Sequence, residues 1–147
     1  MLPLLISSAL FGTTSLILAI VVFIFARSKA NRLWALFNFF IAWWGYGLVM
    51  VCLSRNDEAT AQFWWKLATY GGLYLSVVFV HFAMEFTGSR NKRALIFLYI
   101  QASVIEILYL SKLLNYKLAY LYGSFYYPMA VDATYHIVTL SCTAPSI

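Results

Sequence analysis

Four long apolar stretches separated by short polar loops constrain this chain more than any other feature. They cover residues 2–26, 33–53, 59–88 and 94–111. A helix rises about 1.5 Å per residue, so about 20 apolar residues cross the hydrocarbon core of a bilayer. Each stretch reaches or approaches that length. The pattern predicts an all-α integral membrane protein, with a compact four-transmembrane-helix bundle over residues 1–112.

The charge of the loops alternates along the chain. Six of the ten basic residues lie in two loops, residues 27–32 and 89–93, whereas the loop between them has acids beside its bases. Short loops rich in Lys and Arg stay cytoplasmic. The pattern therefore predicts a multi-pass protein of the inner (cytoplasmic) membrane with its N-terminus outside. Residues 2–26 have no basic segment before them and positive charges after them, which favours a retained helix over a signal peptide.

Composition excludes several classes of protein. The 147 residues are 63% hydrophobic and 10% charged, whereas a soluble domain has about 25% charged residues. The chain therefore lacks the polar surface of a water-soluble protein. The net charge of +5 is an orientation signal that can also contact anionic lipid headgroups, so no nucleic-acid partner is predicted.

The third stretch has a recognisable start. Asn56 is the predicted N-cap of its helix. Asp57 and Glu58 would then lie favourably at the positive end of the helix dipole.

The sequence changes character after residue 112. Residues 117–122 and 125–130 flank Gly123-Ser124, a pair suited to a two-residue hairpin turn. Residues 113–147 are therefore predicted to contain an outer Tyr-rich hairpin or flap. Two alternatives stay open: a fifth helix over residues 118–142, which would bring Pro128, Asp132 and His136 into the membrane at a high cost, or a fifth helix that starts near residues 133–135. A disulfide between Cys52 and Cys142 also stays open.

Small and polar residues recur at helical spacing in each stretch, and membrane helices associate through such residues. The four predicted stripes are Ser8, Gly12, Ser15 and Ala19; Asn38, Gly45 and Cys52; Tyr70, Tyr74, His81 and Glu85; and Tyr99, Ser103 and Glu106. One stripe per helix is what a compact bundle requires.

Depth in the membrane restricts which of these residues can meet. Counted from the cytoplasmic helix ends, Asn38 lies about 8 Å deep and His81 about 10 Å, so depth allows these two residues to meet. Glu106 lies about 18 Å deep and Tyr74 about 21 Å, which makes a Tyr74–Glu106 hydrogen bond a second candidate.

His81 and Glu85 are the most specific pair of candidate residues, because i,i+4 spacing places both ionisable side chains on one helix face. Glu85 can reach His81 or extend toward Arg90. The two are either a proton-sensitive or ligand-contacting pair or a satisfied polar pair that joins helices.

Glu106 stands out for its depth. It is either protonated and hydrogen-bonded or paired with a group outside this chain. Gln101 lies away from the Glu106 face, which indicates that the fourth helix touches a further helix. The candidate contacts for a ligand or partner are Asn38, Tyr70, Tyr74, His81, Glu85, Gln101 and Glu106.

No cofactor is predicted. The sequence has no Cys/His cluster with metal-binding spacing, and depth makes a haem between His81 and His136 implausible. A pigment or other lipophilic cofactor on His81 alone stays open. There is no phosphate-binding glycine loop and no nucleophile with a placed base, so no catalytic residue is predicted and the chain is not expected to be an enzyme.

Several runs resemble a known family. They are residues 31–37 (NRLWALF), 42–47 (AWWGYG), 63–67 (FWWKL), 70–72 (YGG) and 81–88 (HFAMEFTG). They are similar to the seven-helix N-terminal sensor region of bacterial histidine kinases, over helices 1 to 4 and the start of a fifth at residues 135–136. The resemblance implies an outside N-terminus and a cytoplasmic kinase or other output module after helix 7. That module is not within these 147 residues, so autophosphorylation is not carried over.

Two functions follow as hypotheses. In the first, the chain is a non-catalytic membrane module, similar to a sensor input region, that binds a lipophilic ligand or a membrane partner between its helices. In the second, it is a small accessory or structural subunit packed against a larger membrane complex. Expected partners are membrane lipids and either other transmembrane subunits or further copies of the chain.

Overall fold

Four helices and one strand pair make up the part of the chain that the structure, a computed structural model, describes: residues 2–54, 57–89, 91–111, 116–121 and 125–130. The elements are α1 (Leu2–Ile24), α2 (Lys29–Leu53), α3 (Glu58–Phe86), α4 (Lys92–Leu110), β1 (Tyr116–Leu121) and β2 (Phe125–Ala130). The prediction of an all-helical protein with four helices is confirmed.

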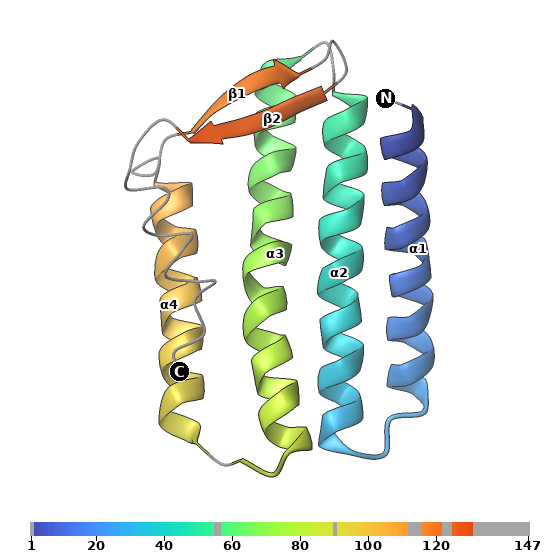
Figure 1. The fold of residues 1–147 in the computed structure, drawn as a ribbon, viewed down its shortest axis with the longest axis vertical. Coiled ribbons are helices and arrows are strands. Elements are labelled where there is room, and N and C mark those ends of the chain that lie inside the picture. The colour runs from blue at the N-terminus through green and yellow to red at the C-terminus, as the bar shows by residue number, and fades with distance from the viewer. Residues whose placement is uncertain (1, 55–56, 90, 112–115, 122–124, 131–147) are drawn as a thin grey trace.

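The helices stand side by side in chain order, as a row (Figure 1). The packing of α1 on α2 and of α2 on α3 is extensive, whereas α4 packs more loosely on α3. The predicted compact bundle is therefore wrong in one respect, since α1 and α4 lie at opposite ends of the row. The physical reason is that α2 has small residues toward both neighbours, Gly45 toward α1 and Gly47 toward α3.

Close helix contacts occur where side chains are smallest. All four residues of the predicted α1 stripe are buried, and a Cβ on Gly45 would lie 3.0 Å from the Gly12 Cα atom. A Cβ on Gly47 would lie 2.6 Å from the Ala68 Cβ. Small residues thus let the backbones of these helices approach closely, as expected for association in a membrane.

Polar caps set the helix starts. α2 begins at Lys29, earlier than predicted, because the Ser28 Oγ accepts from the Asn31 amide at 3.1 Å. The N-cap of α3 is Asp57 rather than Asn56, which lies outside the described residues. The Asp57 carboxylate accepts from the Thr60 hydroxyl and from the amides of Thr60 and Ala59, and these bonds lower its pKa. Above that pKa the cap is a charged acceptor at the positive end of the helix dipole.

Three helices are long and apolar enough to cross a membrane within the described ranges: α1, α2 and α3. The predicted fourth span corresponds to α4, which is 19 residues long and carries Lys92, Arg93 and Glu106.

The strands β1 and β2 pair antiparallel, from Tyr116 with Ala130 to Leu121 with Phe125. They lie across the upper ends of the helices in Figure 1, at the same level as the N-terminal end of α1. The indole Nε1 of Trp65 in α3 donates to the Tyr126 carbonyl oxygen at 2.8 Å, which fastens β2 to α3. A fifth helix over residues 118–142 is excluded for the part that forms these strands. The predicted Gly123-Ser124 turn, the other fifth-helix start, His136 and Cys142 lie outside the described residues, while Cys52 is a buried thiol.

Candidate functional site

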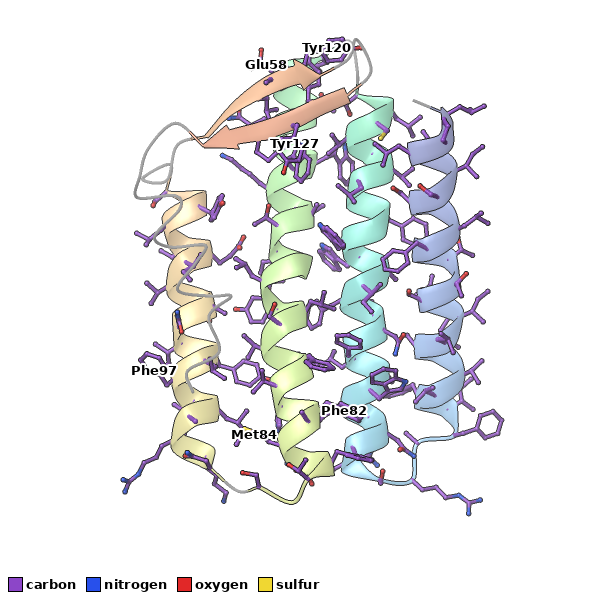
Figure 2. The ribbon with its side chains drawn as sticks, in the orientation of Figure 1. Glu58, Phe82, Met84, Phe97, Tyr120 and Tyr127 are labelled. Carbon is purple, nitrogen blue, oxygen red and sulfur yellow. The ribbon has the colours of Figure 1, made fainter. Side chains whose placement is uncertain are left out.

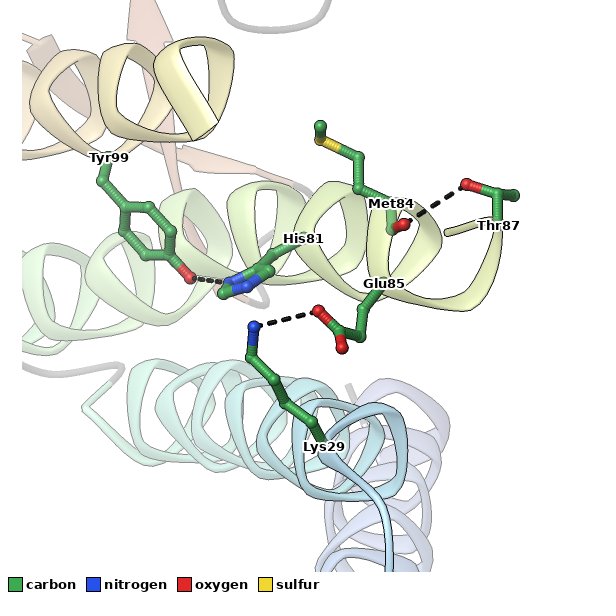
Figure 3. A network of polar contacts seen from close by, with 6 residues as sticks. All are labelled: Lys29, His81, Met84, Glu85, Thr87 and Tyr99. Atoms are coloured by element: carbon green, nitrogen blue, oxygen red, sulfur yellow. Dashed lines mark hydrogen bonds and ion pairs between the residues drawn. The ribbon is translucent and has the colours of Figure 1, made fainter. Parts of the chain in front are cut away.

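An ion pair joins α2 to α3 near the end of the row that carries the α1–α2 and α3–α4 loops (Figure 3). The Lys29 Nζ lies 2.9 Å from the Glu85 Oε2. Both side chains are partly exposed, at 63% and 36%, so the pair contributes about 1 kcal/mol or less. Glu85 was predicted to reach His81 or Arg90; Lys29 is an additional partner from another helix, and Arg90 lies outside the described residues.

One turn deeper, His81 of α3 meets Tyr99 of α4. The His81 Nδ1 lies 3.1 Å from the Tyr99 hydroxyl, and the two rings are nearly perpendicular. The predicted Asn38–His81 pair is wrong. Asn38 is buried, but its Nδ2 donates to the Trp34 carbonyl oxygen at 2.8 Å in its own helix.

A second hydrogen bond joins α3 and α4 further along. The Tyr74 hydroxyl lies 3.0 Å from the Ser103 Oγ, and that Oγ donates to the Tyr99 carbonyl oxygen at 2.9 Å. The single Ser103 proton is thereby used, so Tyr74 is the donor in their shared bond. The predicted Tyr74–Glu106 bond is replaced by this one, with a residue one turn earlier on α4.

Glu106 lies on the same side of α4, next to the buried residues Ala102, Ile105 and Tyr109. Its side chain is 6% exposed, and its Oε2 has no hydrogen-bond partner among the described residues. A buried carboxyl oxygen without a partner is costly. The structure thus leaves one buried carboxyl oxygen of α4 unpaired among the described residues.

Aromatic rings connect α3 to α2 beside these hydrogen bonds. The Tyr70 and Tyr74 ring centroids lie 4.9 Å apart, and Tyr74 stacks on Phe40 at 5.8 Å. Tyr70 also contacts Trp43, whose indole Nε1 donates to the Leu67 carbonyl oxygen at 2.8 Å. Tyr70 therefore belongs to an aromatic contact between α2 and α3, and it remains 37% exposed.

The structure thus brings three predicted polar residues of α4 toward α3: Tyr99, Ser103 and Glu106. We call this set, with His81 and Tyr74, the α3–α4 seam. Gln101 lies elsewhere on α4 and is half-buried. Lys29 was missed as a partner of Glu85. The loop charges could have predicted this pair. Basic loops on one side of a membrane bring their Lys and Arg residues to the level of acidic residues at the ends of neighbouring helices.

The described residues contain no group of three or more His, Cys, Asp or Glu side chains that could hold a metal ion. The chemistry that the seam offers is hydrogen bonding by hydroxyl, imidazole and carboxyl groups in a largely apolar surrounding.

Comparison with known proteins assigns the chain to a family. No curated protein and no solved structure matches it. The model of the family described as the N-terminal 7TM region of histidine kinase matches residues 7–144, which is nearly the whole chain and includes all four helices. With its long apolar helices, the protein is a membrane protein, and it belongs to the family of N-terminal seven-transmembrane regions of histidine kinases.

Proposed function

We propose that this chain is a non-catalytic sensor input module that binds a lipophilic ligand or a membrane partner at the α3–α4 seam. The family is a sensory input region rather than a catalytic domain. The observation that supports a binding role here is the buried Glu106 carboxyl, whose Oε2 has no partner among the described residues.

The chemistry of Glu106 indicates the class of ligand. An ionised carboxylate in a membrane interior without a counter-charge is expensive, so the group is neutral in place. A neutral carboxyl can donate one hydrogen bond and accept others. An uncharged lipophilic molecule with a hydroxyl or carbonyl group complements it.

The packing of α4 suggests how binding would be communicated. α4 contacts α3 less extensively than α2 does. Two hydrogen bonds join described residues of α3 and α4, His81–Tyr99 and Tyr74–Ser103, and such bonds contribute about 1 kcal/mol each. A ligand that favours one position of α4 over another by a few kcal/mol would shift the population between them. Such a shift is the output that an input module needs.

The same proposal includes a membrane orientation. The α1–α2 and α3–α4 loops lie at one end of the row and the β1–β2 hairpin at the other (Figure 1). Both loops are basic, which favours a cytoplasmic position. The N-terminus and the hairpin would then face outward from the cytoplasmic membrane.

Cysteine labelling tests this orientation. In a background with Cys52 and Cys142 replaced by serine, we expect Lys92→Cys to resist a membrane-impermeant maleimide in intact cells and to react after permeabilisation. Tyr120→Cys in β1, which is 44% exposed, should react without permeabilisation. Labelling of Lys92→Cys from outside intact cells would contradict the proposed topology.

The second candidate function, an accessory subunit of a larger membrane complex, is supported by the open row. The outer side of α4 exposes Ile96, Phe97 and Ile100, and Figure 2 shows Phe97 on the side that faces away from α3. Another transmembrane subunit or a second copy of the chain could cover this side.

A ligand screen separates the two functions. Purified full-length chain would be heated with a long-chain alcohol, a methyl ketone or a quinone. The sensor proposal expects stabilisation by at least one, by about 2.7 kcal/mol at a hundredfold excess over its Kd. Glu106→Leu should abolish the response, and Thr14→Val on the exposed side of α1 should keep it. Stoichiometric co-purification with other subunits, and loss of the fold without them, would instead support the accessory function.

A further inference from the structure

A second feature of the molecule lies away from the α3–α4 seam, between α1 and α2. A groove of about 500 Å³ runs along these two helices near the loop that joins them. Its walls are apolar and include Ile20 and Phe23 of α1 and Leu36 and Phe39 of α2. A volume of this size is in the range of small-molecule sites, about 300–1,000 Å³.

The groove has a charged end. Lys29 and Arg32, in the first turns of α2, line it together with the apolar side chains. No acidic residue lies in that turn of α2. Lys29 is engaged by Glu85, whereas Arg32 takes part in no ion pair among the described residues. Arg32 therefore brings to this end of the groove a base that no acid among the described residues occupies, and guanidinium binds phosphate in a bidentate manner.

The length of the groove matches one membrane leaflet. From Lys29 to Phe39 it follows ten residues of helix, which is about 15 Å, or half of the roughly 30 Å hydrocarbon core. Leu16 and Phe39 also line a second apolar hollow of about 490 Å³ that continues toward Met50 and Trp64. The apolar path thus begins at the two bases and continues inward.

We propose that the α1–α2 groove binds an anionic phospholipid, with its phosphate on Arg32 and an acyl chain along Ile20, Phe23, Leu36 and Phe39. The charge at one end, the apolar walls and the leaflet length each match a different part of that molecule. This site is separate from the seam proposed for sensing. Lipid binding here would make the packing of α1 on α2 dependent on the lipids of the inner leaflet.

The test uses the purified full-length chain in mild detergent, with phosphatidylglycerol as the anionic probe and phosphatidylcholine as the neutral one. Native mass spectrometry measures retained lipid, and thermal unfolding measures stabilisation. We expect phosphatidylglycerol to be retained over phosphatidylcholine and to raise the unfolding temperature. Glycerol 3-phosphate, which offers the anion without the chain, should do neither.

Two variants locate the site. Arg32→Gln should weaken phosphatidylglycerol binding about fivefold, and Leu36→Trp, which fills the groove from a 40% exposed position, should weaken it independently of charge. Arg93→Gln is the matched control, because Arg93 is an exposed base in the first turn of α4 outside the groove. Circular dichroism confirms that each variant is helical.

Three results would overturn the proposal: equal binding of the two lipids, equal weakening by Arg93→Gln, or full binding in Leu36→Trp. A response to glycerol 3-phosphate would show a free-phosphate site instead. Dimerisation that Leu36→Trp abolishes without any lipid effect would show that a second copy occupies the groove.

Discussion

Gly47→Leu is expected to prevent α2 from packing on α3. A Cβ at this position would lie 2.6 Å from the Ala68 Cβ and 2.9 Å from its Cα, and neither atom can move without its backbone. Overpacking in a close contact costs about 1–3 kcal/mol, and a leucine here falls at or above the upper end. We expect loss of the monodisperse protein after detergent extraction and a lower unfolding temperature in whatever remains.

Alanine variants at two glycines separate the steric effect from the gain in helix propensity. Gly47→Ala meets the same Ala68 atoms, whereas Gly72→Ala in α3 would meet nothing closer than the Trp44 Cδ1 at 3.8 Å, an ordinary contact. Alanine raises helix propensity by about 1 kcal/mol over glycine at both sites, so the difference between the two variants isolates the steric effect. If Gly47→Ala is as stable as Gly72→Ala, the close approach of α2 and α3 is wrong.

The second large effect concerns Glu106. If its carboxyl is neutral, Glu106→Gln should leave the free energy of unfolding nearly unchanged, because the amide keeps the size and the hydrogen-bonding capacity. Glu106→Arg places a permanent charge at a 6% exposed site and should cost about 3 kcal/mol. Denaturant unfolding of the purified variants measures both values.

A control at the same depth separates burial from position in the membrane. Ile107→Arg introduces the same charge at a 62% exposed position, from which the side chain can extend to the interface, so its cost should be smaller than that of Glu106→Arg. A loss in Glu106→Gln as large as that in Glu106→Arg would mean that Glu106 is ionised and paired with a cation.

Local pattern determined the elements of this protein. Hydropathy and length predicted four helices, and the structure places their ends within a few residues of the prediction. The differences arise at the caps, where single polar groups such as those of Ser28 and Asp57 decide the first turn. The α1 stripe was also predictable, because a helix with one row of small residues among large apolar ones has one side that permits close approach.

Side-chain partners were less predictable, and the reason is geometric. Counting residues from a helix end gives depth along the membrane normal, but it does not give rotation about the helix axis or the order of the helices. Depth alone allowed Asn38 with His81 and Tyr74 with Glu106. In the structure, Asn38 bonds to the carbonyl of Trp34, and Tyr74 bonds to Ser103.

The sequence by itself determined that the chain is a helical membrane protein of the histidine-kinase input family, because apolar length and short motifs are local properties. The tertiary structure alone decided that the helices stand in a row, that α4 packs less extensively than the others, and that Glu106 is buried with one oxygen unpaired among the described residues. These features depend on how pairs of helix surfaces fit across distances in the chain, and no single segment carries that information.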